Sequence, residues 1–298
     1  MGKKPNFIGI GTTKAATTWI FQCLKEHPEI CGSSVKDTRF FNTEYYYRKG
    51  LNYYYSFFKN CPKNSIKGEI TPDYIYHQKT PYLIRKHFPD VKIIIVLRNP
   101  IEKIYSEYRF QKIRKLRLSI YKTLEEAIKK DPMLTKMGYY YKQISKYYDL
   151  FPNENILILF FDDIEKNPIE FMKKIYTFIG AKNIDFIPPS INRKINIYGE
   201  IVGQNKIPYI NSISYKMIIH LKEDRFVKKF IKKIRLDEFL QKFLVFNVKR
   251  LIKTDIVKNN NNLSMNTNTK NYLRLIYKEE IKKLEKFLGI DLSHWKEN

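Results

Sequence analysis

The stretch from Phe7 to Leu24, which reads FIGIGTTKAATTWIFQCL, constrains the fold of this chain more than any other. The apolar run Phe7–Gly11 is typical of a buried strand, and apolar residues then recur at helical spacing from Trp19 onward. Between them lies a loop of small residues that contains one cation, Lys14. A strand, a tight loop and the start of a helix form a cradle for an anion, because the first helical N–H groups lack partners and the helix dipole adds positive charge.

The loop differs from the one that binds nucleoside triphosphates, which ends in Gly-Lys-Ser/Thr. Here Lys14 comes three residues before Thr17, and Ala15 and Ala16 stand where the Gly-Lys pair would be. Small side chains let the backbone approach a phosphate closely, and Thr17 and Thr18 add hydroxyl donors. We therefore expect an anion site here. The alternative is a plain strand–loop–helix connection with a solvent-facing lysine.

The chain has 298 residues, which is enough for one large domain or two small ones, and 43% of them are apolar. Its formal net charge of +25 favours anionic partners, such as nucleotides, nucleic acid, acidic glycans or an anionic membrane. An overall bias toward lysine would raise the charge in the same way without any function.

The three cysteines, at positions 23, 31 and 61, do not suggest a disulfide framework. They have no metal-ligand spacing with the five histidines, so we expect no metal. The first residues lack the pattern of a signal peptide, and no apolar stretch approaches the roughly 18 residues of a membrane span. These features lead us to expect a cytoplasmic protein.

The nearly continuous β-branched run from Val91 to Leu97 predicts a strand that is covered on both faces. Arg98 follows it directly, at the end of the strand where open α/β sheets bind ligands. Pro100 suits the first turn of a helix that carries Ser106 two turns later. A second strand is expected over 155–161, and helices are expected over 81–88, 138–151, 168–179 and 272–288. This alternation predicts a doubly wound α/β fold with a mostly parallel sheet.

A carboxylate among cations stands out at Asp37, which lies between Lys36 and Arg39 and is followed by Phe40 and Phe41. If the two phenylalanines anchor this segment in the core, Asp37 is held in place as a general base would have to be. An ordinary surface loop with local ion pairs is the alternative. The segment 67–74 is interpreted as turn-like, and it contains another carboxylate, Glu69. Residues 162–164 are likewise expected to turn the chain.

The remaining segments are less regular. Residues 116–131 are interpreted as a peripheral insertion, partly helical over 123–130. The loop 192–199 contains Arg193 and Lys194. The basic amphipathic stretch 214–253 could lie on an anionic membrane or bind an acidic polymer, but a helical face packed on the domain with solvated lysines is favoured. The Asn-rich stretch 258–268 is expected to be a mobile loop.

Several of these segments together resemble the sulfotransferases that use 3′-phosphoadenosine 5′-phosphosulfate, in particular the carbohydrate branch that includes heparan-sulfate sulfotransferases and bacterial relatives. FIGIGTTKAATTWI is similar to their 5′-phosphosulfate loop, with Ala15-Ala16 in place of two glycines. VLRNPIEKIYSEY is similar to their 3′-phosphate segment, and KDTRFF to the segment that carries their catalytic Glu. GEITPDY resembles a segment that lines the acceptor cleft, and LEKFLGIDLSHW resembles the ending of many bacterial members.

This resemblance implies a single sulfotransferase domain over 1–298, with a core over 5–185 and a basic helical region over 186–298 packed on it. It implies that Lys14 and Asp37 are catalytic, the latter as a base one methylene shorter than the family's Glu, with Glu69 as the reserve candidate. The implied donor-binding residues are Thr13, Lys14, Ala15, Ala16, Thr17, Thr18, Arg98, Ser106, Arg193 and Lys194. The implied acceptor-binding residues are Lys36, Arg39, Glu69 and Tyr74.

The implied reaction transfers a sulfuryl group from the nucleotide donor, without a metal, to a hydroxyl of a carbohydrate or glycolipid. Nucleic acid is not expected as a partner, and peripheral contact with the inner membrane face is kept open. Two other classes remain as alternatives. One is a P-loop kinase or nucleotide hydrolase, and the other is a non-enzymatic basic protein that binds a polymer or a membrane.

Overall fold

The computed structural model describes residues 4–114, 116–193 and 265–297. The chain divides into two compact units. The first comprises the described parts of 1–104, 132–195 and 270–298, and the second those of 105–131 and 196–269. The single domain expected over 1–298 stays a prediction. The expected basic stretch 214–253 and the first part of the expected mobile loop lie outside the described residues.

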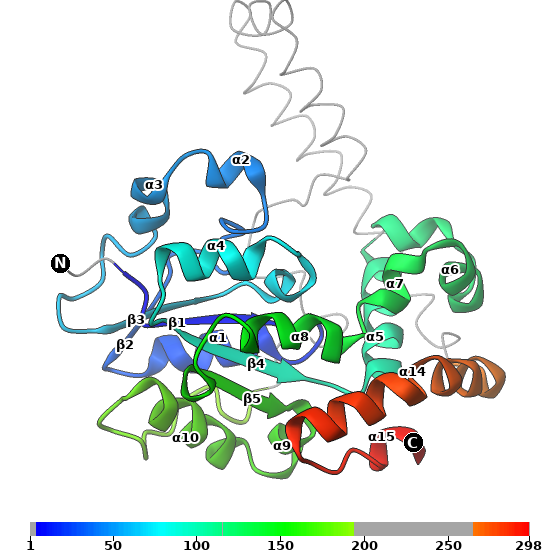
Figure 1. Cartoon of the computed structure of the whole chain (residues 1–298). Coiled ribbons are helices and arrows are strands. Elements are labelled where there is room, and N and C mark those ends of the chain that lie inside the picture. The colour runs from blue at the N-terminus through cyan, green and yellow to red at the C-terminus, as the bar shows by residue number, and fades with distance from the viewer. Residues whose placement is uncertain (1–3, 115, 194–264, 298) are drawn as a thin grey trace, which may run out of the picture. The chain divides into compact units, whose positions relative to one another are not determined.

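A five-stranded parallel sheet forms the centre of the first unit (Figure 1). Its spatial order is β2-β3-β1-β4-β5, and every pairing is parallel. The strands are β1 (Phe7–Gly11), β2 (Ile30–Gly32), β3 (Ile66–Ile70), β4 (Lys92–Leu97) and β5 (Ile156–Phe160). Strands β2 and β3 lie on one side of β1, and the later strands β4 and β5 lie on the other. The strand order therefore reverses between β1 and β4. This confirms the predicted doubly wound parallel sheet.

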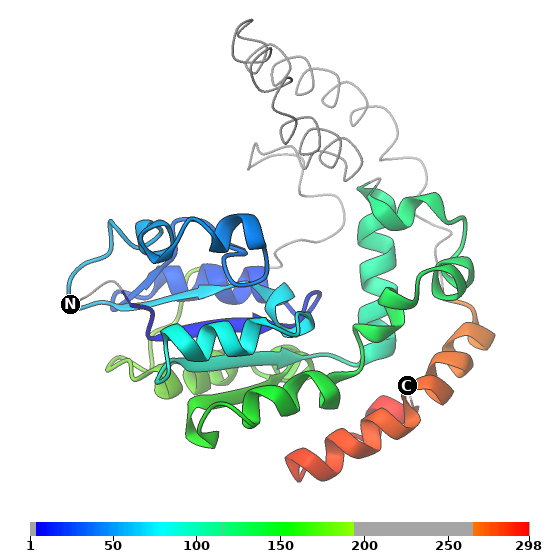
Figure 2. The same ribbon diagram turned by 45° about the horizontal axis from the view of Figure 1, so that its top comes forward.

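The helices lie in two layers around this sheet, with α1 and α10 on one face and α4 and α8 on the other (Figures 1 and 2). Apolar side chains of α1 and α10, among them Trp19 and Phe171, pack on inward-facing residues of β1 and β4 in one buried cluster. The longer helices of this unit are α1 (Thr17–Glu26), α4 (Thr80–His87), α8 (Tyr140–Tyr148), α10 (Pro168–Ile179) and α14 (Thr267–Leu288), the last beginning just before the unit does.

Short elements connect the longer ones. In the first unit they are α2 (Glu44–Tyr47), α3 (Leu51–Ser56), η1 (Pro72–Tyr76), α7 (Pro132–Lys136), η3 (Asn153–Asn155), α9 (Phe161–Lys166) and α15 (His294–Glu297). Helix α5 (Pro100–Ile113) begins in the first unit and continues into the second, which also contains η2 (Arg117–Ile120) and α6 (Leu124–Lys130). The partly helical insertion predicted over 116–131 is confirmed by η2 and α6.

The central strands form where the sequence is apolar throughout. All five residues of β1 and the last five of β4 are buried, as expected for strands covered on both faces. Position 68 of β3 has room only for glycine, because a Cβ there would lie 2.3 Å from the Phe7 ring. Helix α10 is capped at its start by Asn167, whose side chain accepts from the Glu170 N–H, and at its end by Gly180 with φ 83°.

Two local predictions are wrong. Residues 67–74 are not turn-like. They form β3 and then η1, because β3 pairs on both sides and its Glu69 is satisfied internally, so a polar residue does not interrupt the strand. Residues 162–164 lie within α9 instead of a turn.

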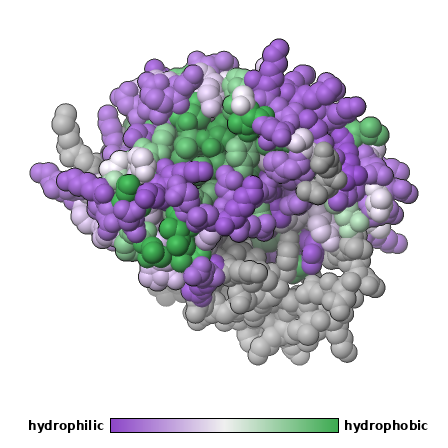
Figure 3. Space-filling view, turned by 90° about the horizontal axis from the view of Figure 1, so that it is seen from below, coloured by the Kyte–Doolittle hydropathy of each residue, from purple (hydrophilic) through white to green (hydrophobic). Residues whose placement is uncertain are grey.

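None of the helices in the described ranges is long and apolar enough to cross a bilayer. On the face drawn in Figure 3, hydrophilic side chains predominate and surround smaller hydrophobic patches.

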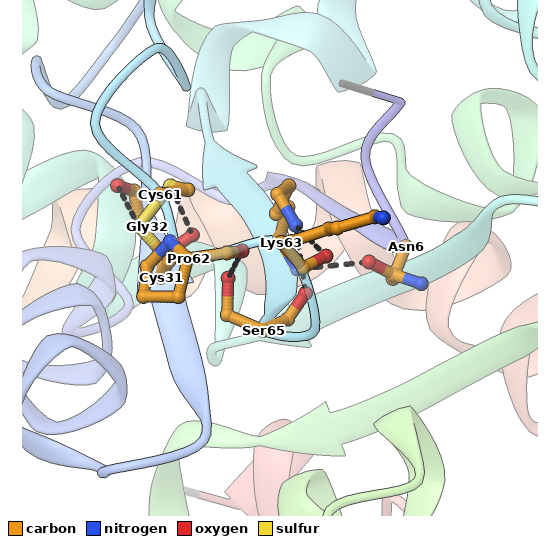
Figure 4. The surroundings of a disulfide bond; sticks show 8 residues. Asn6, Cys31, Gly32, Cys61, Pro62, Lys63 and Ser65 are labelled. Atoms are coloured by element: carbon orange, nitrogen blue, oxygen red, sulfur yellow. Dashed lines mark hydrogen bonds between the residues drawn. A yellow bond between two sulfur atoms is a disulfide. The ribbon is translucent and has the colours of Figure 1, made fainter. Parts of the chain in front are cut away.

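The three cysteines did not suggest a disulfide framework, yet the structure contains one disulfide. Cys31 and Cys61 form a disulfide with a Cα–Cα distance of 5.7 Å (Figure 4). Cys23 is a free, buried thiol. Cys31 lies on β2, and Cys61 lies just before the turn that leads into β3. The two strands pair in parallel, with Ile30 opposite Ile66, so the fold brings together cysteines that are 30 residues apart.

Candidate functional site

The loop after β1 is held against β4 and opens toward the start of α1. Thr12 donates its N–H and its hydroxyl to the Val96 carbonyl, at 2.8 and 3.2 Å. Lys14 and Ala16 adopt left-handed backbone conformations, with φ 64° and 54°. Ala15 is fully buried, and Ala16 caps α1 without a side-chain oxygen. The first N–H groups of α1 are therefore available to an anionic ligand, as the sequence predicts.

Tyr76 of η1 supports this loop from the side. Its hydroxyl accepts the Thr13 N–H at 3.2 Å and lies 3.1 Å from the Thr13 hydroxyl. The Lys103 ammonium lies 5.1 Å from the centre of the Tyr76 ring. Burial raises the pKa of the Tyr76 phenol, so the group stays neutral and can both donate and accept. The sequence analysis missed this residue, because nothing in the pattern PDYIY links it to a loop 63 positions earlier.

Arg98 follows β4 and reaches the Lys14 loop. One guanidinium nitrogen, Nη1, donates to the Lys14 carbonyl at 3.1 Å. The Nε and Nη2 atoms both donate to Glu102 Oε2 at 3.2 Å, and the guanidinium lies 4.2 Å from the centre of the Phe161 ring. The structure thus brings together the two segments that the sequence predicts to bind phosphate.

Ser106 is the second residue predicted for the 3′-phosphate. It lies on α5, half-buried and beyond Ile104, where the first unit ends. Its role stays a prediction.

Asp37 lies at the end of β3, in a loop with an unusual backbone. Its φ is 60° and that of Arg39 is 54°, while its N–H donates to the Ile70 carbonyl at 3.2 Å. The Lys36 ammonium lies 2.6 Å from the Asp37 carboxylate, whose side chain is 37% exposed. Phe40 and Phe41 are buried, so the expected anchoring of this segment is confirmed.

Arg39 and Asp73 form a second, longer ion pair at 3.9 Å beside this loop. Both side chains are more than a third exposed, so the pair contributes little to stability. Arg39 lies two positions after Asp37 in this loop, so its predicted role toward an acidic acceptor stays a prediction.

Glu69 has a different environment from Asp37. It is fully buried, and four hydroxyl groups donate to its two oxygens. The donors are Thr38 at 2.6 Å, Thr71 at 2.7 Å, Tyr54 at 3.0 Å and Tyr74 at 3.1 Å. Burial raises the pKa of the Glu69 carboxyl above its ordinary value, although these hydrogen bonds oppose the shift. Glu69 has neither a free lone pair nor access for an incoming hydroxyl, so Asp37 is the better candidate for the base.

The remaining predicted site residues are Tyr74, Arg193 and Lys194. Tyr74 is buried, and its hydroxyl contacts Glu69 and Thr38 instead of an open cleft. Arg193 is exposed, and its N–H donates to the Ser190 carbonyl at 3.0 Å, while Ser190 itself donates to Glu26 in the last turn of α1. Lys194 lies outside the described residues. The roles assigned to all three stay predictions.

Taken together, three neighbouring parallel strands, β3, β1 and β4, end at one edge of the sheet and position the candidate groups. Asp37 is bonded to the end of β3, the Lys14 loop follows β1, and Arg98 follows β4. The edge between β1 and β4 is also where the strand order reverses, which is where open α/β sheets bind ligands. The arrangement can hold a polyanion on helix N–H groups and two cations, beside a carboxylate.

Comparison with known proteins places this geometry in a family. A family model described as "Sulfotransferase domain" matches residues 4–191, more than half of the chain. The membrane-associated sulfotransferase kil1 of Dictyostelium discoideum is 36% identical over 109 residues, which cover 36% of this chain and 23% of that protein. Human bifunctional heparan sulfate N-deacetylase/N-sulfotransferase 3 is 26% identical over 196 residues, which cover 59% of this chain and 22% of that protein.

A crystal structure of a sulfotransferase from Alicyclobacillus acidocaldarius has the same fold, with a TM-score of 0.67, 17% identity, and coverage of 98% of this chain and 99% of that one. The chain spans only about a quarter or less of the length of the first curated relatives it matches. The match to the family model nevertheless extends over the sheet, the Lys14 loop and the Asp37 segment. The chain belongs to the sulfotransferase domain family.

Proposed function

We propose that this protein transfers a sulfuryl group from 3′-phosphoadenosine 5′-phosphosulfate to a hydroxyl group of a carbohydrate. One observation carries the proposal: Arg98 donates to the backbone of Lys14, so a planar cation and an uncapped helix N-terminus lie side by side at the edge where the strand order reverses. A donor with phosphates at both ends of an adenosine needs two anion sites within one nucleotide's length.

The residues present fit such a donor. The N–H groups at the start of α1, the hydroxyls of Thr17 and Thr18, and the Lys14 ammonium suit the 5′-phosphosulfate. The guanidinium of Arg98 is a planar fork that matches phosphate oxygens. Ser106 is proposed to add a hydroxyl to the 3′-phosphate, and Arg193 and Lys194 to approach the adenosine.

The reaction balances with the groups at this edge. The acceptor oxygen attacks sulfur and forms a new O–S bond, while the bond from sulfur to the bridging oxygen of the donor breaks. Adenosine 3′,5′-bisphosphate leaves with that electron pair, and the Lys14 ammonium stabilises the charge that develops there. The hydroxyl proton passes to Asp37. As in phosphoryl transfer, the protein contributes mainly positioning and electrostatic stabilisation.

A carbohydrate acceptor is favoured by the relatives, since several that align with about 60% of this chain are named for heparan sulfate. Arg39 and Lys36 beside Asp37 suit an acidic sugar or a glycolipid head group. Contact with an anionic membrane stays a proposal that concerns residues outside the described ranges.

The location is proposed from the disulfide. Disulfides persist where thiols are oxidised and are rare in the cytosol. The Cys31–Cys61 bond therefore weighs against the expected cytoplasmic location, and we propose that the protein folds in an oxidising compartment.

The proposal is tested with the purified chain, adenosine 3′,5′-bisphosphate and ³⁵S-labelled donor. Calorimetry should show binding of the bisphosphate without magnesium and no binding of ATP. Fully desulfated, N-acetylated heparin should become labelled when it is used as the carbohydrate probe, and 2-naphthol should not.

Lys14→Ala should abolish labelling, because it removes the charge at the leaving oxygen. Lys25→Ala is the matched control, since Lys25 is an exposed lysine in the last turn of α1, the helix that follows the Lys14 loop. Labelling by Lys14→Ala at the rate of the unmodified protein, or tight ATP binding, would contradict the proposal.

A further inference from the structure

The buried carboxylate of Glu69 joins strand β3 to the loop that carries Asp37. Thr38, which lies between Asp37 and Arg39, donates its hydroxyl to Glu69 Oε2 at 2.6 Å. Thr38 is itself buried, with 4% of its surface exposed, although both of its neighbours are partly exposed. The loop is therefore fastened to the sheet by the side chain between its two candidate functional residues.

Further hydrogen bonds extend this connection along the loop. The Tyr74 hydroxyl, which donates to Glu69 Oε1, accepts the Phe41 N–H at 3.3 Å and lies 2.9 Å from the Thr38 hydroxyl. The Phe40 N–H points to the Thr38 hydroxyl at 3.4 Å. Two consecutive N–H groups of the loop thus bond to hydroxyls that themselves bond to Glu69.

The loop needs such support because its backbone is strained. Asp37 and Arg39 both have positive φ, which is uncommon for residues with a side chain and is unfavourable unless the surroundings enforce it. Two such residues on either side of a buried threonine direct both charged side chains away from the core. Without the bond from Thr38 to Glu69, the loop could relax to ordinary backbone angles and move the Asp37 carboxylate.

We propose that Glu69 is a positioning residue, which acts through Thr38 to hold Asp37 and Arg39 in place for the acceptor. This proposal rests on the proposed function, because it assigns Asp37 to the acceptor hydroxyl. It also replaces the acceptor-binding or reserve-base role predicted for Glu69 by an indirect one. The proposed donor site does not depend on Glu69, because the Lys14 loop is held by hydrogen bonds to Val96 and Tyr76.

The chain offers a matched pair of threonines for the test. Thr38 and Thr71 are both buried, and both donate to the same oxygen of Glu69, at 2.6 and 2.7 Å. Only Thr38 belongs to the Asp37 loop. Replacing each by valine removes the same kind of bond from the same carboxylate, so a difference between the two variants reports on the loop.

The first measurement is amide hydrogen exchange of residues 37–42 by mass spectrometry, which needs neither donor nor acceptor. Thr38→Val should speed exchange in this segment at least tenfold, whereas Thr71→Val should change it less than threefold. Glu69→Gln should behave like Thr38→Val, and Thr38→Ser, which keeps the hydroxyl, should restore protection.

The second measurement is kinetic, with desulfated, N-acetylated heparin as the acceptor probe. Thr38→Val should lower kcat at least tenfold, while the affinity for adenosine 3′,5′-bisphosphate stays within twofold; Thr71→Val should stay within threefold in both. Equal losses in the two valine variants, or unchanged exchange in Thr38→Val, would overturn the proposal. If the unmodified protein transfers no sulfate, the proposed function fails, and the exchange comparison still decides whether Glu69 holds the loop.

Discussion

At the scale of single residues, the sharpest contrast is between two carboxylates that lie close along one strand end. Asp37 is partly exposed and has one ammonium at 2.6 Å, whereas Glu69 is enclosed by four hydroxyls. A general base has to reach the proton it removes, so accessibility separates the two. Both residues are acidic, so the sequence alone could not predict which of the two carboxylates is accessible.

Asp37→Asn tests the proton transfer directly. Because the amide is nearly isosteric but cannot accept a proton as readily, sulfate transfer to desulfated heparin should fall about 100-fold or more. Binding of adenosine 3′,5′-bisphosphate, measured by calorimetry, should stay within twofold. Asp90→Asn, the same change at an exposed position in the turn before β4, is the control and should leave both values unchanged. Full activity of Asp37→Asn would remove this residue from the reaction.

At the scale of elements, the junction of β4 and α5 decides how freely Arg98 can meet a phosphate. Two of its nitrogens donate to Glu102, which lies in the first turn of α5 and is 48% exposed. A bound phosphate would compete with that carboxylate for the same donors. The exposed pair is worth about 1 kcal/mol or less, so the competition is modest.

Glu102→Gln should therefore strengthen the binding of adenosine 3′,5′-bisphosphate, by up to about fivefold, since the competing charge is removed. The effect should shrink as salt is added, because exposed charges are screened. Calorimetry at two salt concentrations measures both effects. Glu165→Gln, in the neighbouring pocket lined also by Glu102 and Asp162, is the control. Weaker binding in Glu102→Gln would show that Glu102 orients Arg98 for the phosphate instead of competing with it.

At the scale of the whole molecule, the sequence predicted what depends on local pattern. The strands β1, β4 and β5, the start of α1 and the positions of the two segments predicted to bind phosphate follow from apolar runs, residue spacing and the helix-end residues Pro100 and Gly180. What it could not predict depends on contacts between distant residues. Tyr76 beneath Thr13, the hydroxyls around Glu69, and the pairing of Cys31 with Cys61 exist only once β2, β3 and β1 lie side by side.

The disulfide closes a segment of 30 residues that includes the whole Asp37 loop, but not the Lys14 loop or Arg98. Closing a loop of this length limits the unfolded chain and is expected to stabilise the fold by about 3 to 4 kcal/mol. Chemical denaturation of the double variant Cys31→Ser/Cys61→Ser should show a loss of about that size. Because the closed segment carries Asp37, the loss should be accompanied by slower transfer, while bisphosphate binding is retained.

Reduction of the unmodified protein should have the same effect as the double variant, and the same reductant should leave the double variant unchanged. The third cysteine does not complicate the experiment, since burial raises the pKa of the Cys23 thiol to about 12 and keeps it unreactive in the folded state. Mass spectrometry after alkylation should accordingly find no modified thiol in the native, oxidised protein and one after unfolding. Two or more alkylated thiols in the native protein would show that the bond is absent, and with it the argument for an oxidising compartment.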